Sequence, residues 1–160
     1  MRWKLRSGII AAGAVGLGWA AIRRMGAFRV RVAGDSMWPT LEADQFLIAT
    51  TPAGRLRRGD VVVVRRPERP LEVVKRIVGV PGERVVVQDG RVEVEGRRLV
   101  EPYARGTGPS GSWRLAADEY LVLGDNRDRS SDSRAFGPVP AGAIVGIVRF
   151  RYRPGAGRVT

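Results

Sequence analysis

Lysine is rare in this chain, and one of its lysines lies where a buried base could work. Lys4 and Lys75 are the only lysines among 28 basic residues. Lys4 belongs to a basic N-terminal run, whereas Lys75 lies in the apolar stretch LEVVKRIVGV, residues 71–80. An arginine stays protonated in proteins, but a buried lysine can become a neutral amine. Lys75 is therefore a candidate general base; the alternative is a chance exception to a genomic preference for arginine.

Composition restricts the chemistry available to such a base. The chain has 160 residues, 44% of them hydrophobic, which is enough for one domain with a real core, with or without a small appendage. It has no histidine and no cysteine. This excludes a Ser-His-Asp triad, a cysteine nucleophile, disulfides and the usual zinc sites. Serine, threonine, lysine, tyrosine, arginine and the carboxylates remain.

Two polar stretches supply candidate partners for Lys75. In GDSMWPTL, residues 34–41, Ser36 lies where an expected strand gives way to a turn set by Pro39. Such a position can expose a hydroxyl beside backbone N–H groups, although ordinary turn chemistry also accounts for the stretch. The second stretch, GDNRDRSSDSRAFGPVP, residues 124–140, directly follows an apolar strand. Its alternative interpretation is a solvated loop in which Asp132 and Arg134 pair.

Charge points to a membrane rather than to nucleic acid. The net charge is +12, and residues 1–31 hold seven cations and no acid. These cations flank SGIIAAGAVGLGWAAI, residues 7–22, whose sixteen uncharged residues form a short but plausible membrane-spanning helix. The flanking arginines can extend their charged ends to the membrane surface, and Trp3 and Trp19 suit its interfaces. Both features favour a membrane anchor over residues 1–25. A cleavable signal peptide and a buried glycine-rich helix are the alternatives.

The rest of the chain, residues 26–160, is predicted to be mainly β. Alternating or continuous apolar runs separated by turn residues indicate antiparallel strands. ERVVVQDGRVEVEGRRLV, residues 83–100, predicts a hairpin with Asp89 and Gly90 at its tip. We expect residues 101–119 to be a loop and the region of about 83–119 to add only this hairpin to the catalytic domain. The remaining expected strands lie at 28–34, 45–50, 61–66, 71–80, 119–125 and 143–152.

Four segments in order resemble the type I signal peptidases. These are GDSMWPTL, RGDVVVV, KRIVGVPGE and GDNRDRSSDSRAFG, and the resemblance covers roughly residues 28–150. It implies a barrel-like fold of twisted antiparallel sheets behind one N-terminal transmembrane helix. It also implies a membrane-bound serine endopeptidase that removes signal peptides from secreted preproteins through a Ser/Lys dyad. Specialised maturation peptidases of the same family, and much less plausibly a non-enzymatic tethered basic β domain, are the alternatives.

The resemblance assigns roles to individual residues. Ser36 is the nucleophile, and its backbone N–H is one oxyanion-hole donor. Lys75 is the general base, and Ser130 is expected to hydrogen-bond it. Asp132 and Arg134 match a structural ion pair beside the site. Some members carry a serine hydroxyl as second donor two residues before the nucleophile, where this chain has Gly34, so another donor is expected there.

Strand alternation leaves one point open. Val73, Lys75 and Ile77 share one face of their strand, and Arg76 lies on the other face with apolar neighbours. The sequence does not decide which face is buried, but a deprotonable lysine is the better candidate. As base, Lys75 needs a pKa lowered from about 10.4 toward roughly 7–8 by burial.

The same resemblance implies where the protein acts and on what. We expect a single-pass, monomeric plasma-membrane protein whose catalytic domain lies outside the cytoplasm. Its partners are preprotein signal peptides and the lipid bilayer, without nucleic acid, cofactor or metal. The substrate lies extended along the strand at 28–34, and small residues before the cut enter shallow apolar pockets. The candidate pocket walls are Val32, Met37 and Val74.

Overall fold

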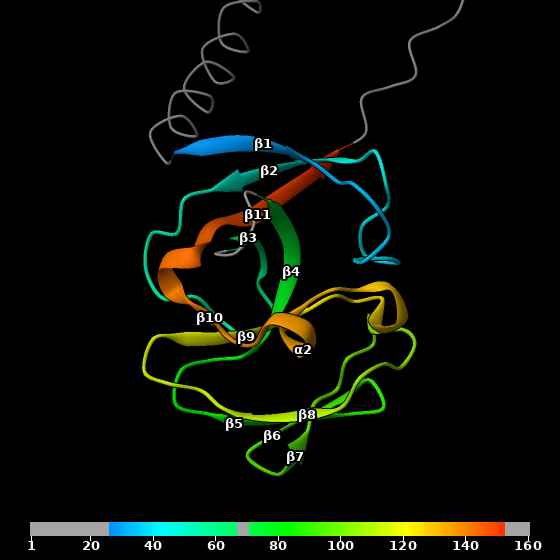
Figure 1. Ribbon diagram of the computed structural model, residues 1–160. Helices are drawn as coiled ribbons and strands as arrows, with labels where there is room; N and C mark the ends of the chain where they lie inside the picture. Colours follow the sequence, from blue (N-terminus) through cyan, green and yellow to red (C-terminus); the bar gives the residue numbers. More distant parts are fainter. Residues whose placement is uncertain (1–25, 67–70, 153–160) are drawn as a thin grey trace, which may run out of the picture.

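The computed structural model describes residues 26–66 and 71–152, which form antiparallel sheets, as predicted (Figure 1). The expected anchor, residues 7–22, lies outside these residues. Within them, no helix has the length and apolar character needed to cross a bilayer. The strands are β1 (Ala27–Arg31), β2 (Phe46–Thr50), β3 (Val61–Arg65), β4 (Glu72–Gly79), β5 (Arg84–Gln88), β6 (Arg91–Val94), β7 (Arg97–Arg98), β8 (Gly111–Arg114), β9 (Glu119–Leu123), β10 (Val139–Pro140) and β11 (Ile144–Tyr152).

Seven strands form one curled sheet in the order β1-β2-β11-β3-β4-β9-β10. Its strands are rich in valine and isoleucine, whose branched side chains pack well on a pleated surface. Register shifts in β11 and near the end of β4 mark bulges, which increase local twist. Figure 1 shows this sheet bending round through β11, β3 and β4. The half-barrel curl brings the turn after β1 near the middle of β4.

A second sheet, in the order β7-β6-β5-β8, lies below the first in Figure 1. The hairpin of β5 and β6 around Asp89 and Gly90 is confirmed. The expectation of a hairpin alone was wrong, because β7 and β8 complete a four-stranded sheet. The prediction of a continuous loop over 101–119 was wrong for the same reason. β8 is only four residues long and gains its stability from pairing with the edge of β5.

Three apolar clusters hold these layers together. One lies inside the curl, with Val62, Ile77, Val122 and Ile147 fully or nearly fully buried. A second lies between the two sheets, where Val78, Leu121 and Leu123 of the large sheet meet valines of β5 and β6. The third gathers beneath the turn that follows β1. A short helix, α2 (Ser133–Phe136), and the 3₁₀ turns Arg127–Arg129 and Ala141–Ala143 complete the described elements.

Gly79, the last residue of β4, lies where the two sheets approach most closely. A β carbon built at Gly79 lies 2.6 Å from Val85 Cγ2 and 2.8 Å from Leu115 Cδ1, both of which belong to the cluster between the sheets. These distances are too short for real atoms, so any larger residue must push the sheets apart. Glycine is therefore a packing requirement here.

We expect Gly79→Ala to lower the free energy of unfolding by about 1–3 kcal/mol, because one added methyl group overfills this junction. Urea unfolding of the full chain measures the change. Gly142→Ala is the matched control, since a β carbon at Gly142 meets nothing within 4 Å and its φ is not positive. Equal stability of the two variants would contradict the packing argument.

Candidate active site

Ser36 and Lys75 meet at the centre of the site. Ser36 lies in the turn after β1, and Lys75 lies in β4, which crosses beneath that turn. Lys75 Nζ is 2.8 Å from Ser36 Oγ, a hydrogen-bond distance. Lys75 Nζ also donates to the Val74 carbonyl at 2.9 Å, which fixes the direction of the amine. Two side chains 39 residues apart are thus placed to exchange a proton.

Burial makes Lys75 an unusually weak base for a lysine. Its side chain lies inside the fold, with only 3% of the residue exposed. Desolvation lowers the pKa of Lys75 from 10.5 to about 8, because water no longer stabilises the ammonium. Asp132 and Asp125 act in the opposite direction through space, but neither touches the amine. Lys75 can therefore be neutral in a sizeable fraction of molecules near neutral pH.

Arg76, on the opposite face of β4, is buried as well. Its guanidinium donates to both carboxylate oxygens of Asp125, at 2.8 and 2.6 Å, and to the Gly59 carbonyl at 3.0 Å. The Tyr103 ring covers it, with its centroid 3.9 Å away. Thr40 donates a 2.5 Å hydrogen bond to the same carboxylate. The sequence posed a choice between burying Lys75 and burying Arg76, and the fold buries both because β4 is covered on its two faces.

Asp132 and Arg134 form a bidentate ion pair beside the site, with distances of 2.8 and 2.9 Å. Both side chains are almost fully buried. Burial alone raises the pKa of Asp132, but hydrogen bonds from Arg134 and the Gly124 N–H, with help from Ser130, outweigh it and hold that pKa below its usual value. The pair holds the loop from Gly124 to Arg134 together, because Asp132 also accepts from the Gly124 N–H at 3.0 Å and Arg134 donates to the Arg127 carbonyl at 2.8 Å.

The expected hydrogen bond between Ser130 and Lys75 is absent. The Ser130 hydroxyl is buried, and no hydrogen bond of standard geometry joins it to another group in the described parts of the chain. It lies near enough to the Asp132 carboxylate to help lower the pKa of that group. Ser130 lies directly against Gly124, where a β carbon would come 2.2 Å from its Oγ, so the hydroxyl packs against the start of its own loop.

Sequence reasoning missed a third buried pair, Arg127 with Glu101. Arg127 donates to Glu101 at 2.7 Å and to the carbonyls of Gly124 and Gly90. Gly90 is the tip of the β5–β6 hairpin, so this arginine joins the small sheet to the loop beside the active site. Sequence analysis could have used the arginines of residues 124–134, which directly follow the buried strand β9. Each arginine that is buried there needs an acidic or carbonyl acceptor, and this would have prompted a search for partners such as Glu101.

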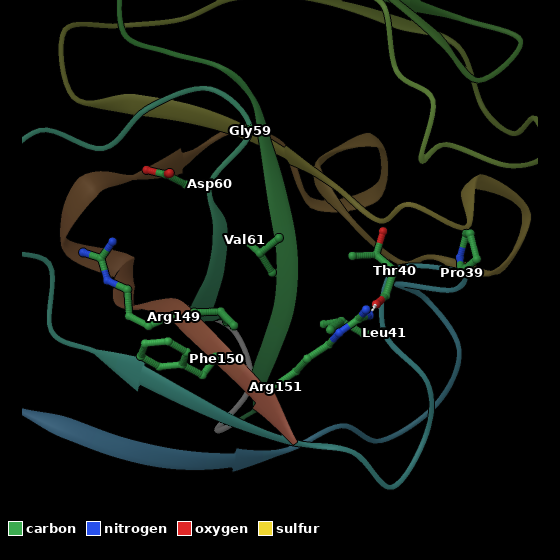
Figure 2. A pocket seen from close by; sticks show the side chains of 10 residues that line it. Pro39, Thr40, Leu41, Gly59, Asp60, Val61, Arg149, Phe150 and Arg151 are labelled. Atoms are coloured by element: carbon green, nitrogen blue, oxygen red, sulfur yellow. Dashed lines mark hydrogen bonds between the residues drawn. The ribbon is translucent and has the colours of Figure 1, made fainter. Parts of the chain in front are cut away.

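The candidate pocket walls come together in the cluster beneath the turn. Val32 and Met37 are buried there, and Val74 packs against them. A groove of about 520 Å³ lies elsewhere on the described part of the chain. In Figure 2, Asp60 and Arg149 lie on one side of this groove and Thr40 lies on the other. Arg151 donates a hydrogen bond to the Thr40 carbonyl. Neither Ser36 nor Lys75 lines this groove.

Gly34 explains why no serine hydroxyl stands two residues before Ser36. Its φ is +83°, a conformation that L residues rarely adopt. A β carbon there would meet nothing within 4 Å, so backbone conformation, and not space, selects glycine. The Ser36 N–H donates to no acceptor within residues 26–66 and 71–152. That N–H is available to an incoming oxygen.

We expect Lys75→Met to stabilise the folded chain at pH 7 and to lose that advantage as the pH rises. The folded chain sheds the Lys75 proton near pH 8, and the unfolded chain sheds it near pH 10.5. Between these values the unfolded chain binds more protons, so the stability of the unsubstituted protein increases with pH. The separation corresponds to about 3 kcal/mol. Methionine has no proton to lose, so the difference between variant and parent shrinks by about 2–3 kcal/mol between pH 7 and pH 10.

Urea unfolding of both proteins across this pH range checks the expectation. Arg91→Met is the control, because it removes an exposed cation of β6 that has no part in the contact between Ser36 and Lys75. Its effect should not vary with pH. A Lys75→Met effect that is also independent of pH would show that Lys75 keeps an ordinary pKa.

Known proteins resemble this chain in amino-acid sequence and in fold. A family profile, "Signal peptidase, peptidase S26", matches residues 3–153. Signal peptidase I of Leptolyngbya laminosa is 36% identical over 137 residues, covering 77% of this chain and 67% of that protein. Signal peptidase I of Bacillus caldolyticus is 37% identical over 142 residues, covering 77% and 78%. The crystal structure of a signal peptidase I from Enterococcus faecalis V583 matches with a TM-score of 0.55 and 27% identity, covering 61% of this chain and 100% of that one. The chain therefore belongs to the signal peptidases of peptidase family S26 and is a peptidase of the type I signal peptidase group.

Proposed function

We propose that this peptidase is a membrane-bound serine endopeptidase that removes N-terminal signal peptides from secreted preproteins, with Ser36 as nucleophile and Lys75 as general base. The observation that carries the proposal is the 2.8 Å contact between Ser36 Oγ and a buried lysine whose pKa is lowered to about 8. The relatives named signal peptidase I support the choice of substrate.

The proposed reaction begins with neutral Lys75. Its amine accepts the Ser36 hydroxyl proton while Oγ attacks the carbonyl carbon of the scissile peptide bond. The oxyanion that forms accepts a hydrogen bond from the Ser36 N–H. Collapse of the tetrahedral intermediate breaks the C–N bond, and Lys75 ammonium gives its proton to the departing amine of the mature protein. Water, activated in turn by Lys75, then hydrolyses the ester on Ser36.

An exposed sheet edge supports extended binding of the preprotein. Among residues 26–66 and 71–152, β1 pairs with β2 alone, so its other edge can pair with an added strand. Within the same residues, positions 72–74 of β4 pair with β3 alone, since β9 begins to pair with β4 at Arg76, and they offer a second edge to the substrate. A substrate strand along β1 then passes Ser36, and its small side chains enter the cluster of Val32, Met37 and Val74.

The proposed location follows from the sequence before β1. β1 begins at Ala27, three residues after the basic pair that closes the apolar segment 7–22. We infer that this segment anchors a monomeric enzyme in the plasma membrane with the catalytic domain outside the cytoplasm. Enzyme and signal peptide then share one bilayer, which confines the cleavage site to the height of Ser36.

Ser36→Ala should fold normally and cleave a detergent-solubilised preprotein at least about 10³-fold more slowly, because no other hydroxyl is placed against Lys75. Gel analysis of preprotein cleavage measures the rate. Ser112→Ala, an exposed serine of β8, is the matched control and should remain fully active. Appreciable processing by a clean Ser36→Ala preparation would refute the proposed nucleophile.

Lys75→Arg should abolish cleavage, although arginine is the cation used almost everywhere else in this chain. The guanidinium stays protonated and cannot accept the Ser36 proton. The unsubstituted enzyme should gain activity as the pH rises through about 8, where Lys75 loses its proton, and the variant should show no such rise. Circular dichroism and thermal melts accompany the kinetics, since arginine is larger. A folded variant with near-normal turnover would disprove the role of Lys75 as base.

A further inference from the structure

One residue, Asn126, holds the peptide groups on both sides of the Ser36 α carbon. Its backbone N–H donates to the Ser36 carbonyl at 3.0 Å. Its side-chain Nδ2 donates to the Asp35 carbonyl at 3.1 Å, across 91 residues of sequence. Asp35 O accepts a second bond, from the Trp38 N–H at 3.0 Å, which closes the turn. Asn126 lies in the loop from Gly124 to Arg134 but touches neither Lys75 nor the Asp132–Arg134 pair by any hydrogen bond.

The bond to Asp35 matters because of peptide geometry. The Asp35 carbonyl and the Ser36 N–H belong to the same planar trans peptide group, so they point in opposite directions. Holding the carbonyl toward Asn126 therefore aims the Ser36 N–H away from it, toward the side on which no described group accepts its hydrogen bond. This N–H is the donor that the proposed reaction needs for the oxyanion.

Asn126 is itself held firmly enough to act as a clamp. Its neighbours exchange backbone hydrogen bonds with Arg105, at 2.8 Å for Asp125 and 2.7 Å for Arg127. Asp125 is fixed by its buried pair with Arg76, and Arg127 by its pair with Glu101. A position between two buried ion pairs restricts both the backbone and the side chain of Asn126.

We propose that Asn126 is a positioning residue that orients the Ser36 N–H as the oxyanion-hole donor, an inference that rests on the proposed function. Asparagine suits the task because its amide donates to a carbonyl that can only accept. The clamp matters more in this chain because Gly34 offers no hydroxyl as a second donor. Its contribution should concern the transition state and not the binding of the extended substrate.

Asn126→Ala, made in the full chain in detergent, should lower kcat by about 10- to 100-fold with KM changed less than about threefold. Loss of a whole oxyanion donor costs about 10²–10³-fold, and the Trp38 N–H still holds Asp35 O in part. A substrate-derived peptide aldehyde, whose adduct with Ser36 carries the oxyanion or its protonated form, should bind more weakly by a similar factor. A substrate peptide that cannot be cleaved, because proline follows the cleavage site, should bind to the variant as tightly as to the parent enzyme. The pH at which activity rises should stay near 8, because the Ser36–Lys75 contact is untouched.

Arg129→Ala is the matched control. Arg129 also contacts Asp35, at 3.0 Å, but through the exposed carboxylate and not through the peptide group. The Arg129→Ala variant should have a kcat within about twofold of that of the parent enzyme. Aspartate is nearly equal in size to asparagine but lacks the Nδ2 donor, so Asn126→Asp should show the same loss of kcat. This variant replaces Asn126→Ala in the test if the alanine variant does not fold.

The outcomes separate this inference from the proposed function. Normal kcat in a folded Asn126→Ala or Asn126→Asp variant, with Ser36→Ala inactive, would overturn the clamp alone. Equal losses of aldehyde and blocked-peptide binding would also overturn it, because they indicate general damage to the site. Full activity of Ser36→Ala would instead refute the proposed function itself.

Discussion

The site depends on a lysine that is buried without a carboxylate partner. Three carboxylates surround this part of the fold, and each is taken by its own arginine: Asp125 by Arg76, Asp132 by Arg134 and Glu101 by Arg127. A bidentate arginine pair satisfies a buried carboxylate and keeps it charged in place. Lys75 is left with Ser36 and a backbone carbonyl as its hydrogen-bond partners. Desolvation therefore dominates its pKa, and the amine can serve as a base near neutral pH.

These pairs also make the separate parts of the fold into one structure. Arg76 reaches from β4 to Asp125, two residues after β9, and Arg127 reaches from the following loop to the tip of the β5–β6 hairpin. The small sheet thereby braces the loop that lies against Ser36. Breaking a buried pair by removing one partner leaves an uncompensated charge, which costs about 3–5 kcal/mol. This cost penalises any rearrangement that would free a carboxylate to approach Lys75.

The turn that carries Ser36 is shaped by backbone groups more than by side chains. Gly34 supplies a positive φ, Trp38 closes the turn onto Asp35, and Gly124 lets the neighbouring loop approach Ser36 closely. A β carbon at Gly124 would lie 2.5 Å from the Ser36 carbonyl oxygen. Glycine thus allows two loops that lie far apart in sequence to meet at Ser36. The resulting contact orients the Ser36 N–H without occupying it.

Local sequence was sufficient for most strands and for the two central residues. Apolar runs between turn residues indicated eight strands, β1 to β6, β9 and β11, and one lysine in an arginine-rich chain drew attention to Lys75. Only the tertiary structure decided the rest, because the decisive contacts span long distances along the chain. Arg76 finds Asp125 across 49 residues, so nothing near Arg76 revealed that both faces of β4 are buried. β8 exists because β5 offers an edge, and Ser130 packs against Gly124 without a hydrogen bond to Lys75. The sequence determined which groups could react, and the fold decided which of them meet, since burial and ion pairing depend on neighbours that only folding supplies.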